Sequence, residues 1–503
     1  MIEGLLGGVA NILQPMHLLI LFAGVMVGFI GGGIPGISGT MLVIILLPVT
    51  YALDPIAAFL LLTSIYATSV FSGAISAILF RTPGTPEAVA TVFDGYPMAQ
   101  KGEGGKALGI AIFCSATGGV LGTLVLIFLT PVLAKFALAF ASPEYFGLAI
   151  LGLTVVASLS GNNLVKGFIG VLLGLFVATI GLDTLTGDPR FTFGSGQLMS
   201  GINFIPVLIG LFAISEVLRR VQQRQSLKSH NNIQSNLPDR SLLKRLRGVI
   251  GRSTILGVII GILPGIGATT AAMLSYSQAA RTSKNSAEFG KGAPEGIAAP
   301  ETANNAAAMG ALVPLFALGI PGSATTAVLL GAFILHGIQP GPLMFETQGT
   351  LLYTIFIGLI LANLAILFLA KPFIKVFAKI LLVPYEIVGP LIVMFCIVGT
   401  YAVRNSVFDI AVMLAFGIIG YYFEKTKFPL APIVLGIVLG PIAEVHFRRA
   451  MEMSNGDITI FFTRPISLIM ILLAIVSFVV PLLRIWKDNR TKNNINDQNK
   501  KAI

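Results

Sequence analysis

Long apolar runs separated by short polar connections make up most of this 503-residue chain. The first run covers about residues 15–30, and neither lysine nor arginine occurs before Arg81. No basic segment precedes this run and no small-residue cleavage site follows it, so we expect a first membrane helix and not a cleaved signal peptide. Because a membrane-spanning helix needs about 20 apolar residues, the chain has room for about 10–12 transmembrane helices. The pattern predicts an all-α, polytopic membrane protein.

Composition supports this prediction. Hydrophobic residues form 55% of the chain and charged residues 11%, whereas ordinary soluble domains contain about 25% charged residues. So few charges exclude a water-soluble multidomain enzyme, and they also exclude a disordered chain, which needs low hydrophobicity and high charge. The two cysteines, Cys114 and Cys396, lie in apolar runs. We therefore expect neither a disulfide framework nor a cysteine metal site.

The net charge of +11 is concentrated in one stretch. Residues 219–252 contain nine basic residues and a single acid, Asp239. Lysine and arginine resist translocation, so this basic loop is expected in the cytoplasm, together with the polar tail after Trp486. The stretch contains no aromatic residue, which disfavours nucleic-acid binding, and we expect no nucleic-acid partner.

The basic loop divides two halves that resemble each other. Six residues of the first half recur 229 positions later in the second half: Gly28, Gly32, Pro35, Gly36, Ile37 and Thr40 become Gly257, Gly261, Pro264, Gly265, Ile266 and Thr269. Each half then has a second Pro-Gly pair, 48 residues on at Pro83 in the first half and 57 residues on at Pro321 in the second. We expect a first membrane repeat over residues 1–218, a cytoplasmic loop over 219–252, a second repeat with extra helices over 253–485, and a cytoplasmic tail over 486–503.

Duplicated membrane halves with interrupted helices at matching places are typical of secondary transporters. If the loop and the tail lie inside and the nearly uncharged N-terminus lies outside, the first half has an odd number of spans. Its copy then enters the membrane from the other side. The expected fold is therefore two inverted structural repeats with broken or re-entrant helices at the Pro-Gly motifs.

Small and hydroxylated residues follow each Pro-Gly break. Proline and glycine cannot continue a helix in an apolar run, and broken helices persist in a membrane only where protein or a watery cavity surrounds them. A half-helix that begins there presents free N–H groups to a carboxylate; the alternative is a set of kinks with close helix contacts. We expect substrate binding at Pro35, Gly36, Ser38, Gly39, Thr40, Thr82, Gly84, Thr85, Gly265, Gly267, Thr269, Thr270, Gly322, Ser323 and Thr325.

Three further polar residues are candidates for binding an ion or the substrate. Asn304 and Asn305 offer carbonyl oxygens to a coupling ion, Na⁺ or H⁺, or amide donors to a carboxylate; the alternative is a helix cap. Arg81, beside the first Thr-Pro-Gly-Thr turn, pairs with an anionic substrate or extends to the membrane edge. Beyond the coupling ion we expect no cofactor.

Several enzyme chemistries are disfavoured. The nearest sequences to a phosphate loop, at Lys106 and Lys291, lack the following hydroxyl residue, and the four histidines show no metal-ligand spacing. One enzymatic alternative remains: Gly36-Ile37-Ser38-Gly39 matches the G-x-S-G of rhomboid-type intramembrane serine proteases. The repeat places Gly267 at the position of Ser38, so it keeps the turn and discards the nucleophile. We expect no enzyme.

These motifs together resemble the large membrane subunit of the bacterial tripartite tricarboxylate transporters. The resemblance rests on G-G-G-I-P-G-I-S-G-T at 31–40, R-T-P-G-T-P at 81–86, the passage at 93–109, and P-E-T-A-N-N-A-A-A-M-G with L-G-I-P-G-S-A-T-T-A at 300–327. It implies an inner-membrane permease that works with a small four-helix membrane subunit and a periplasmic solute-binding protein. It also implies uptake of di- or tricarboxylates such as citrate, driven by a sodium or proton gradient. The substrate, the coupling ion and the oligomeric state are left open.

Overall fold

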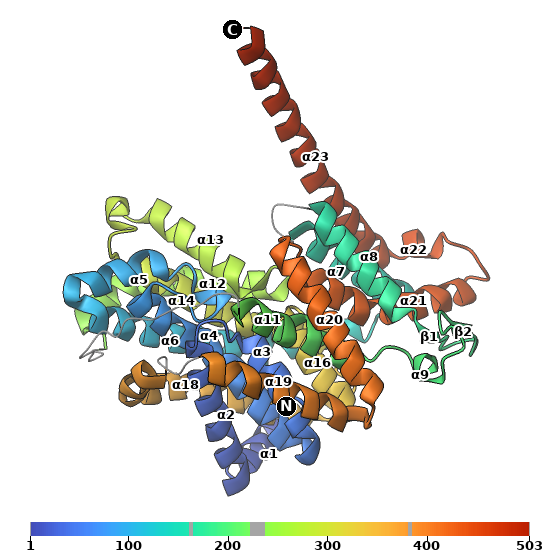
Figure 1. Cartoon of the computed structure of the whole chain (residues 1–503), viewed down its shortest axis with the longest axis horizontal. Coiled ribbons are helices and arrows are strands. Elements are labelled where there is room, and N and C mark those ends of the chain that lie inside the picture. Colours follow the sequence, from blue (N-terminus) through green and yellow to red (C-terminus); the bar gives the residue numbers. More distant parts are fainter. Residues whose placement is uncertain (1, 160–163, 222–236, 381–384, 502–503) are drawn as a thin grey trace. The chain divides into compact units, whose positions relative to one another are not determined.

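A computed structural model describes residues 2–159, 164–221, 237–380 and 385–501, and these are almost entirely helical (Figure 1). The strands in the described residues are β1 (Gly181–Leu182) and β2 (Pro189–Arg190), a short antiparallel pair in which Gly181 lies opposite Arg190. The chain folds into two compact units. Unit 1 comprises residues 1–138 and 203–422, and unit 2 comprises residues 139–202 and 423–503. The prediction of an all-α fold is confirmed.

Unit 1 carries the four Pro-Gly turns. Its elements are α1 (Ile2–Ile12), α2 (Pro15–Gly33), α3 (Gly39–Leu46), η1 (Pro48–Ala52), α4 (Pro55–Phe80), η2 (Pro86–Ala88), α5 (Val92–Met98), η3 (Ala99–Glu103), α6 (Gly104–Ala137), α10 (Phe204–Leu208), η4 (Ile209–Ile214), α11 (Ser215–Val221), α12 (Arg240–Ile262), α13 (Gly267–Thr282), η5 (Ser286–Glu288), α14 (Pro294–Gly310), α15 (Leu312–Leu318), α16 (Ala324–Leu335), α17 (Met344–Thr347), α18 (Gly349–Ile380), α19 (Tyr385–Arg404) and most of α20 (Val407–Lys425).

Unit 2 is built on α7 (Ser142–Leu159), α8 (Leu164–Ala178), α9 (Gly196–Met199), α21 (Ala431–Met453), α22 (Ile460–Thr463) and α23 (Pro465–Lys501), with β1 and β2. Helix α21 packs against α7 and α8, and α23 packs against α7. Asp183 follows β1 and pairs with Arg190 and Arg448, which both also pair with Glu444. Backbone N–H groups of Leu185 and Thr186, followed by Arg448, lower the pKa of Asp183 to about 2. This charged network fixes the hairpin to α21.

Eight helices in the described part of the chain are long and apolar enough to cross a membrane: Pro15–Gly33, Pro55–Phe80, Val92–Ala137, Gly349–Ala370, Glu386–Arg404, Val407–Lys425, Ala431–Met453 and Pro465–Leu483. Four apolar helices are shorter: Gly39–Ala52, Ser142–Ala157, Leu164–Ala178 and Ala324–Leu335. The last of these has 12 residues, which rise only about 18 Å, whereas the hydrocarbon core is about 30 Å thick. The number of full-length helices is below the expected 10–12, and two of the four shorter helices, Gly39–Ala52 and Ala324–Leu335, follow Pro-Gly turns.

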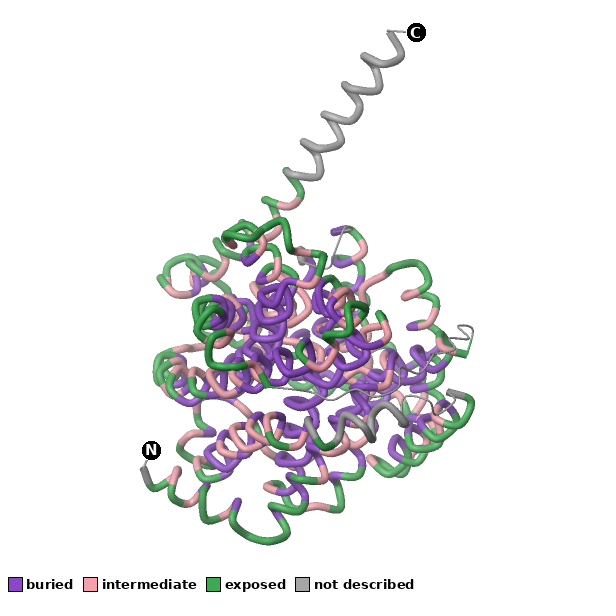
Figure 2. Tube along the Cα trace, turned by 90° about the vertical axis from the view of Figure 1, so that its left-hand side faces the viewer, coloured by how far each residue is buried: buried purple, intermediate pink, exposed green. Residues whose placement is uncertain are grey.

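Two helices, α4 and α14, form the centre of unit 1. Every residue of α4 from Ala57 to Leu79 is buried, and so is every residue of α14; Figure 2 shows such buried positions as long continuous stretches of the tube. Helix α4 begins at Pro55 after Asp54, whose carboxylate caps it by accepting a hydrogen bond from the Ala57 N–H at 3.1 Å. A helix that is apolar all round requires protein or lipid on every side, and in unit 1 other helices enclose α4.

Glycines pack the helices of both halves in the same way. A β-carbon on Gly28 or Gly32 of α2 would lie 2.7 Å from the carbonyl oxygen of Ile65 or Ser69 on α4. In the second half, a β-carbon on Gly257 or Gly261 of α12 would lie 2.4 or 2.2 Å from the carbonyl oxygen of Ala303 or Ala307 on α14. The glycines are related by 229 positions and their partners by 238. Only glycine permits such close backbone contact in a membrane.

The ends of these helices repeat as well. The capping residues Ile34 of α2 and Leu263 of α12 have nearly the same backbone angles, and each donates its N–H to the carbonyl three residues earlier. Arg81 after α4 and Gly319 after α15 are both left-handed and are related by the same 238 positions. The duplication read from the sequence is therefore a duplication of contacts. That the repeats are inverted across the membrane stays a prediction.

The compact units cut across the sequence halves. Residues 139–202 of the first half and residues 423–485 of the second both belong to unit 2, whereas the expected boundaries at residues 218 and 253 refer to the sequence repeat and stay a prediction. The basic stretch is helical at both ends: Arg219 and Arg220 lie in α11, and residues 240–252 lie in α12. Residues 222–236 of the expected loop lie outside the described residues. The tail expected from residue 486 continues α23 to Lys501.

Candidate functional site

The Pro-Gly turns interrupt the helices where the sequence predicts. Helix α2 ends at Gly33 and α3 begins at Gly39; α12 ends at Ile262 and α13 begins at Gly267. Gly36 and Gly265 adopt positive φ angles of 92° and 82°, a region that side chains with a β-carbon rarely occupy. At these two turns glycine is therefore required by the backbone itself.

The turns of the two halves pair crosswise in unit 1. Helix α3, after the first turn of the first half, packs against α16, which follows the second turn of the second half. Helix α13 packs in the same manner against η2 of the first half. The hydroxyls of Thr40 and Thr325 are hydrogen-bonded at 2.6 Å, and the Gly265 N–H donates to the Gly322 carbonyl at 2.9 Å. Residues from all four turns thus lie in one region of the fold.

Several of the predicted hydroxyls cap the half-helices. The Ser38 Oγ accepts a hydrogen bond from the Met41 N–H at 3.1 Å at the start of α3. At the start of α16, Ser323 Oγ accepts from the Thr326 N–H at 3.2 Å, and Thr326 Oγ1 accepts from the Ser323 N–H. Three N–H groups at the starts of these half-helices are therefore already bonded.

The start of α13 is more open. It has no side-chain cap, and a β-carbon on Gly267, at φ 76°, would meet nothing within 4 Å. Thr269 and Thr270 lie half-buried in its first turn. This half-helix keeps its N-terminal N–H groups free of side-chain caps, so it fits the carboxylate-binding role better than α3 and α16 do.

The turn at residues 82–85 is tightly packed. A β-carbon on Gly84 would lie 2.5 Å from the Gly32 carbonyl oxygen. The Thr82 hydroxyl donates to the Phe80 carbonyl at 3.3 Å. The Thr85 hydroxyl is buried and lies near the Glu87 carboxylate, but it makes no well-directed hydrogen bond. A β-carbon on Gly39 would lie 2.2 Å from Ser69 Oγ, and Pro35 is buried. Gly84, Gly39 and Pro35 therefore shape the turns from within.

Arg220 is a site residue that the sequence analysis missed, because it counted this arginine in the basic loop. A β-carbon on Gly36 would lie 1.6 Å from Arg220 Nε, so the guanidinium rests directly on the first Pro-Gly turn. Arg220 Nε also donates to Glu216 at 2.9 Å, and Arg219 Nε donates to the other oxygen of the same carboxylate at 2.9 Å. Two arginines thus bind the same carboxylate beside the turn.

Tyr66 and Glu87 also reach the turns and were not predicted. The Tyr66 hydroxyl, on α4, lies close to the Ser323 side chain and to the Glu87 carboxylate. Glu87 belongs to η2, and its backbone carbonyl accepts a hydrogen bond from the Asn304 amide at 3.2 Å. The sequence offered one signal that Glu87 could reach the turn, because it lies only five residues after Thr82 in the first half.

Asn304 and Asn305 lie on α14 and are 0% and 1% exposed. The Asn305 amide donates to the Asn304 side-chain oxygen at 2.8 Å and to the Glu301 carbonyl at 3.0 Å. The Asn305 side-chain oxygen is buried without a hydrogen-bond partner. These residues lie in the interior of the helix, so the alternative of a helix cap is wrong. The neighbouring Glu301 carboxylate accepts hydrogen bonds from Thr91 and Ser115 and was missed by sequence reasoning.

Arg81 lies apart from this cluster. It is the exposed, left-handed residue that ends α4, and its guanidinium lies 5.7 Å from the centre of the Tyr96 ring. This stacking is typical of a surface arginine. The structure therefore favours the second of the two interpretations offered for Arg81.

Ser38 shows no sign of a protease nucleophile. Its described hydrogen bond is the helix cap to Met41. The three described histidines lie near other groups: His17 bonds the Asn11 carbonyl, His336 lies 3.4 Å from Thr50, and His446 lies 3.5 Å from Ser142. None of these described histidines is hydrogen-bonded to Ser38, and a serine that lacks such a base is a weak nucleophile.

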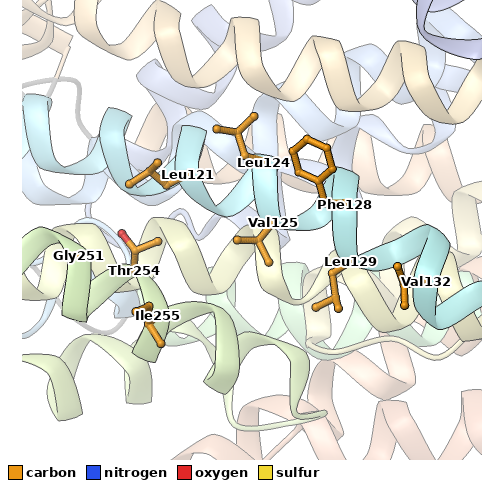
Figure 3. Close-up of a pocket in the computed structure, with 9 residues that line it drawn as sticks. All are labelled: Leu121, Leu124, Val125, Phe128, Leu129, Val132, Gly251, Thr254 and Ile255. Carbon is orange, nitrogen blue, oxygen red and sulfur yellow. The ribbon is translucent and has the colours of Figure 1, made fainter. Parts of the chain in front are cut away.

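A groove of about 570 Å³ lies away from the turns, between α6 and α12 (Figure 3). Leu121, Leu124, Val125, Phe128, Leu129 and Val132 line it from α6, with Gly251, Thr254 and Ile255 from α12. Apart from Thr254 these side chains are apolar. The Thr254 hydroxyl donates to the Ile250 carbonyl of its own helix at 2.9 Å. Such a lining suits lipid tails or another membrane helix better than a carboxylate.

Comparison with known proteins assigns the family. The model of the tripartite tricarboxylate transporter TctA family matches residues 18–435. An uncharacterised 52.8 kDa protein in the TAR-I ttuC' 3' region of Agrobacterium vitis is 38% identical over 98% of both chains. An uncharacterised protein in the TAR-II ttuC' 3' region of the same organism is 42% identical over 48% of this chain and all of its own length. No solved structure matches the chain. With its apolar helices and its paired Pro-Gly turns, this multi-pass membrane protein belongs to the TctA family of tripartite tricarboxylate transporters.

Proposed function

We propose that this chain is the large permease subunit of a tripartite transport system that imports di- or tricarboxylates of the citrate kind. The observation that carries the proposal is the crosswise pairing of the Pro-Gly turns, with Arg220 resting on Gly36. A sodium or proton gradient drives uptake across the bacterial inner membrane. A periplasmic solute-binding protein delivers the substrate, and a small four-helix membrane subunit completes the complex.

The chemistry of the turns suits a carboxylate. A di- or tricarboxylate must shed water to cross the membrane, and buried polar groups have to replace that water. The N–H groups at the start of α13 and the hydroxyls of Thr269 and Thr270 supply neutral donors. Arg220 adds one positive charge, which it shares with Glu216 in the empty carrier. A substrate carboxylate competes with Glu216 for this guanidinium, so the empty carrier never buries an unpaired arginine.

Reconstitution tests the tripartite assignment. We expect the purified chain in liposomes to accumulate little labelled citrate, succinate or malate under a sodium or proton gradient. Adding the small membrane subunit and the solute-binding protein should raise accumulation of at least one of these acids more than tenfold. Collapsing the gradient with ionophores is the control. Full accumulation by the chain alone would argue for a stand-alone carrier instead.

The proposed membrane orientation has its own test. We place the basic segment between α11 and α12 and the C-terminal tail in the cytoplasm, because both are rich in lysine and arginine. Alkaline phosphatase fused near Ser235 or Asn494 should be inactive, whereas a fluorescent protein fused at either site should fluoresce. Strong phosphatase activity at one of the two sites would contradict the inverted repeats, since both sites must lie on the same side.

A further inference from the structure

Glu301, in the middle of α14, is a fully buried carboxylate. Neutral groups surround it. Oε1 accepts a hydrogen bond from the Thr91 hydroxyl ahead of α5, and Oε2 accepts one from the Ser115 hydroxyl on α6 at 2.7 Å. The Asn304 side chain lies close to the same carboxylate. These donors hold the carboxylate in position, but none of them brings a positive charge.

Two charged groups on helices that pack against α14 have partners of their own. Asp94 on α5 accepts hydrogen bonds from the Tyr276 hydroxyl on α13 at 2.9 Å and from two backbone N–H groups ahead of α14. Arg245 on α12 pairs with Glu295, in the first turn of α14, at 2.5 Å. None of these charges faces Glu301.

The remaining titratable neighbours are not basic either. The thiol of Cys114 on α6 is buried beside Glu301 and Thr302. Glu87 on η2 is an acid as well, and it meets α14 through its backbone carbonyl. Among the residues that the structure describes, no salt bridge reaches Glu301. An ionised carboxylate at this place therefore lacks a counter-charge, which a buried site does not tolerate well.

Two oxygen atoms of the same helix lack hydrogen-bond partners. They are the Thr302 hydroxyl oxygen and the Asn305 side-chain oxygen, both buried. Asn305 lies one helical turn after Glu301 and donates its amide to the Glu301 backbone carbonyl, so its head group lies over that turn. Buried polar atoms nearly always have a partner. These oxygens without partners lie on the helix that carries an acid without a counter-charge, and together they point to a ligand with positive charge.

We propose that Glu301 binds the coupling cation, a proton or Na⁺, and that Asn304 links this site to the substrate turn. The inference rests on the proposed function. Asn304 donates its amide to the Glu87 carbonyl at 3.2 Å, two residues after Thr85, and accepts from Asn305. When Glu301 is empty, its negative charge opposes a carboxylate at the turn; when a cation occupies it, the opposition disappears. Each ligand then favours binding of the other, as reciprocal linkage requires.

The test uses the full transporter with both partner proteins in liposomes. Two activities are compared: accumulation of labelled citrate, succinate or malate under an imposed gradient, and counterflow exchange without a gradient. We expect Glu301→Gln to lose more than 50-fold in accumulation and to keep exchange within about threefold, because glutamine imitates the neutral, occupied carboxyl group. The exposed Glu346→Gln, the same change on α17, should leave both activities unchanged. Normal accumulation by Glu301→Gln, or equal loss of both activities, overturns the proposal.

Measurements of direct binding distinguish a proton from Na⁺ as the coupling cation. They also distinguish failure of the role proposed for Glu301 from failure of the proposed function. Purified complex is tested for ²²Na⁺ binding and, with a pH indicator, for proton uptake when substrate is added. Loss of ²²Na⁺ binding in Glu301→Gln identifies sodium, loss of proton uptake identifies a proton, and retention of both overturns the role of Glu301. A wild-type complex that binds the cation but moves none of the three acids overturns the proposed function alone. If Glu301→Gln fails to fold, Ser115→Ala and Thr91→Val should shift half-saturation by the cation three- to tenfold, and no shift overturns the proposal.

Discussion

We expect Gly36→Leu to abolish carboxylate uptake while the protein remains folded in the membrane. The φ angle of Gly36 is 92°, and a residue with a β-carbon costs roughly 1–2 kcal/mol more there than glycine. The larger effect is on Arg220. A β-carbon on Gly36 would lie 1.6 Å from Arg220 Nε, so the guanidinium must leave the turn. Uptake by the complete transporter in liposomes measures the loss.

Gly102→Leu is the matched control for this variant. Gly102 has a similar φ of 84°, is exposed, and a β-carbon there would meet nothing within 4 Å. The control therefore carries the same backbone strain without moving Arg220, and it should keep uptake within about threefold. Gel filtration in detergent shows whether each variant is folded. Equal uptake by the two leucine variants would mean that the first Pro-Gly turn is only a kink.

We expect Arg220→Gln to lower uptake by one to two orders of magnitude, chiefly by raising KM. A charge-assisted hydrogen bond to a carboxylate contributes about 1.5–3 kcal/mol, which corresponds to this range. Arg220→Lys should restore only part of the affinity, because lysine keeps the charge and loses the flat, forked set of donors. The concentration dependence of uptake by the complete transporter measures both changes.

Arg219→Gln controls for the lost ion pair. Both arginines pair with Glu216, but the Arg219 side chain is 44% exposed and that of Arg220 only 15%. A pair at an exposed position contributes little to stability, so Arg219→Gln should leave KM nearly unchanged. If the two glutamine variants raise KM equally, the arginines serve to position α11 through Glu216 and do not contact the substrate.

The sequence predicted those features whose causes are local. Composition identified the membrane as the solvent of the chain, because a charge content of 11% cannot cover a soluble surface. The breaks at Pro35-Gly36 and Pro264-Gly265 follow from the missing proline N–H and the positive φ of the glycines, which belong to the residues themselves. The duplication was visible for the same reason: each repeat needs the same small residues wherever two backbones touch.

The tertiary structure decided which of the marked residues meet. Thr40 and Thr325 are 285 positions apart and share a hydrogen bond, yet no spacing in the sequence relates them. Ser38 and Ser323, expected to bind the substrate, cap their own helices. Serine is a preferred N-cap residue, and in both half-helices its hydroxyl is bonded to the helix that it begins. Whether a hydroxyl at such a turn is bonded within its own helix or across to another is visible only in the tertiary structure.

By itself, then, the sequence determined the solvent, the helical class, the interruptions and the repeat, because hydrophobicity and backbone preference act residue by residue. Only the tertiary structure placed Arg220 on Gly36 and enclosed Glu301 among hydroxyls. In the sequence Arg220 is one basic residue among nine, and Glu301 is one polar residue before an apolar run. Their roles depend on the groups that surround them, since the energy of a charge is set by its neighbours and its distance from water, and helix packing alone fixes both.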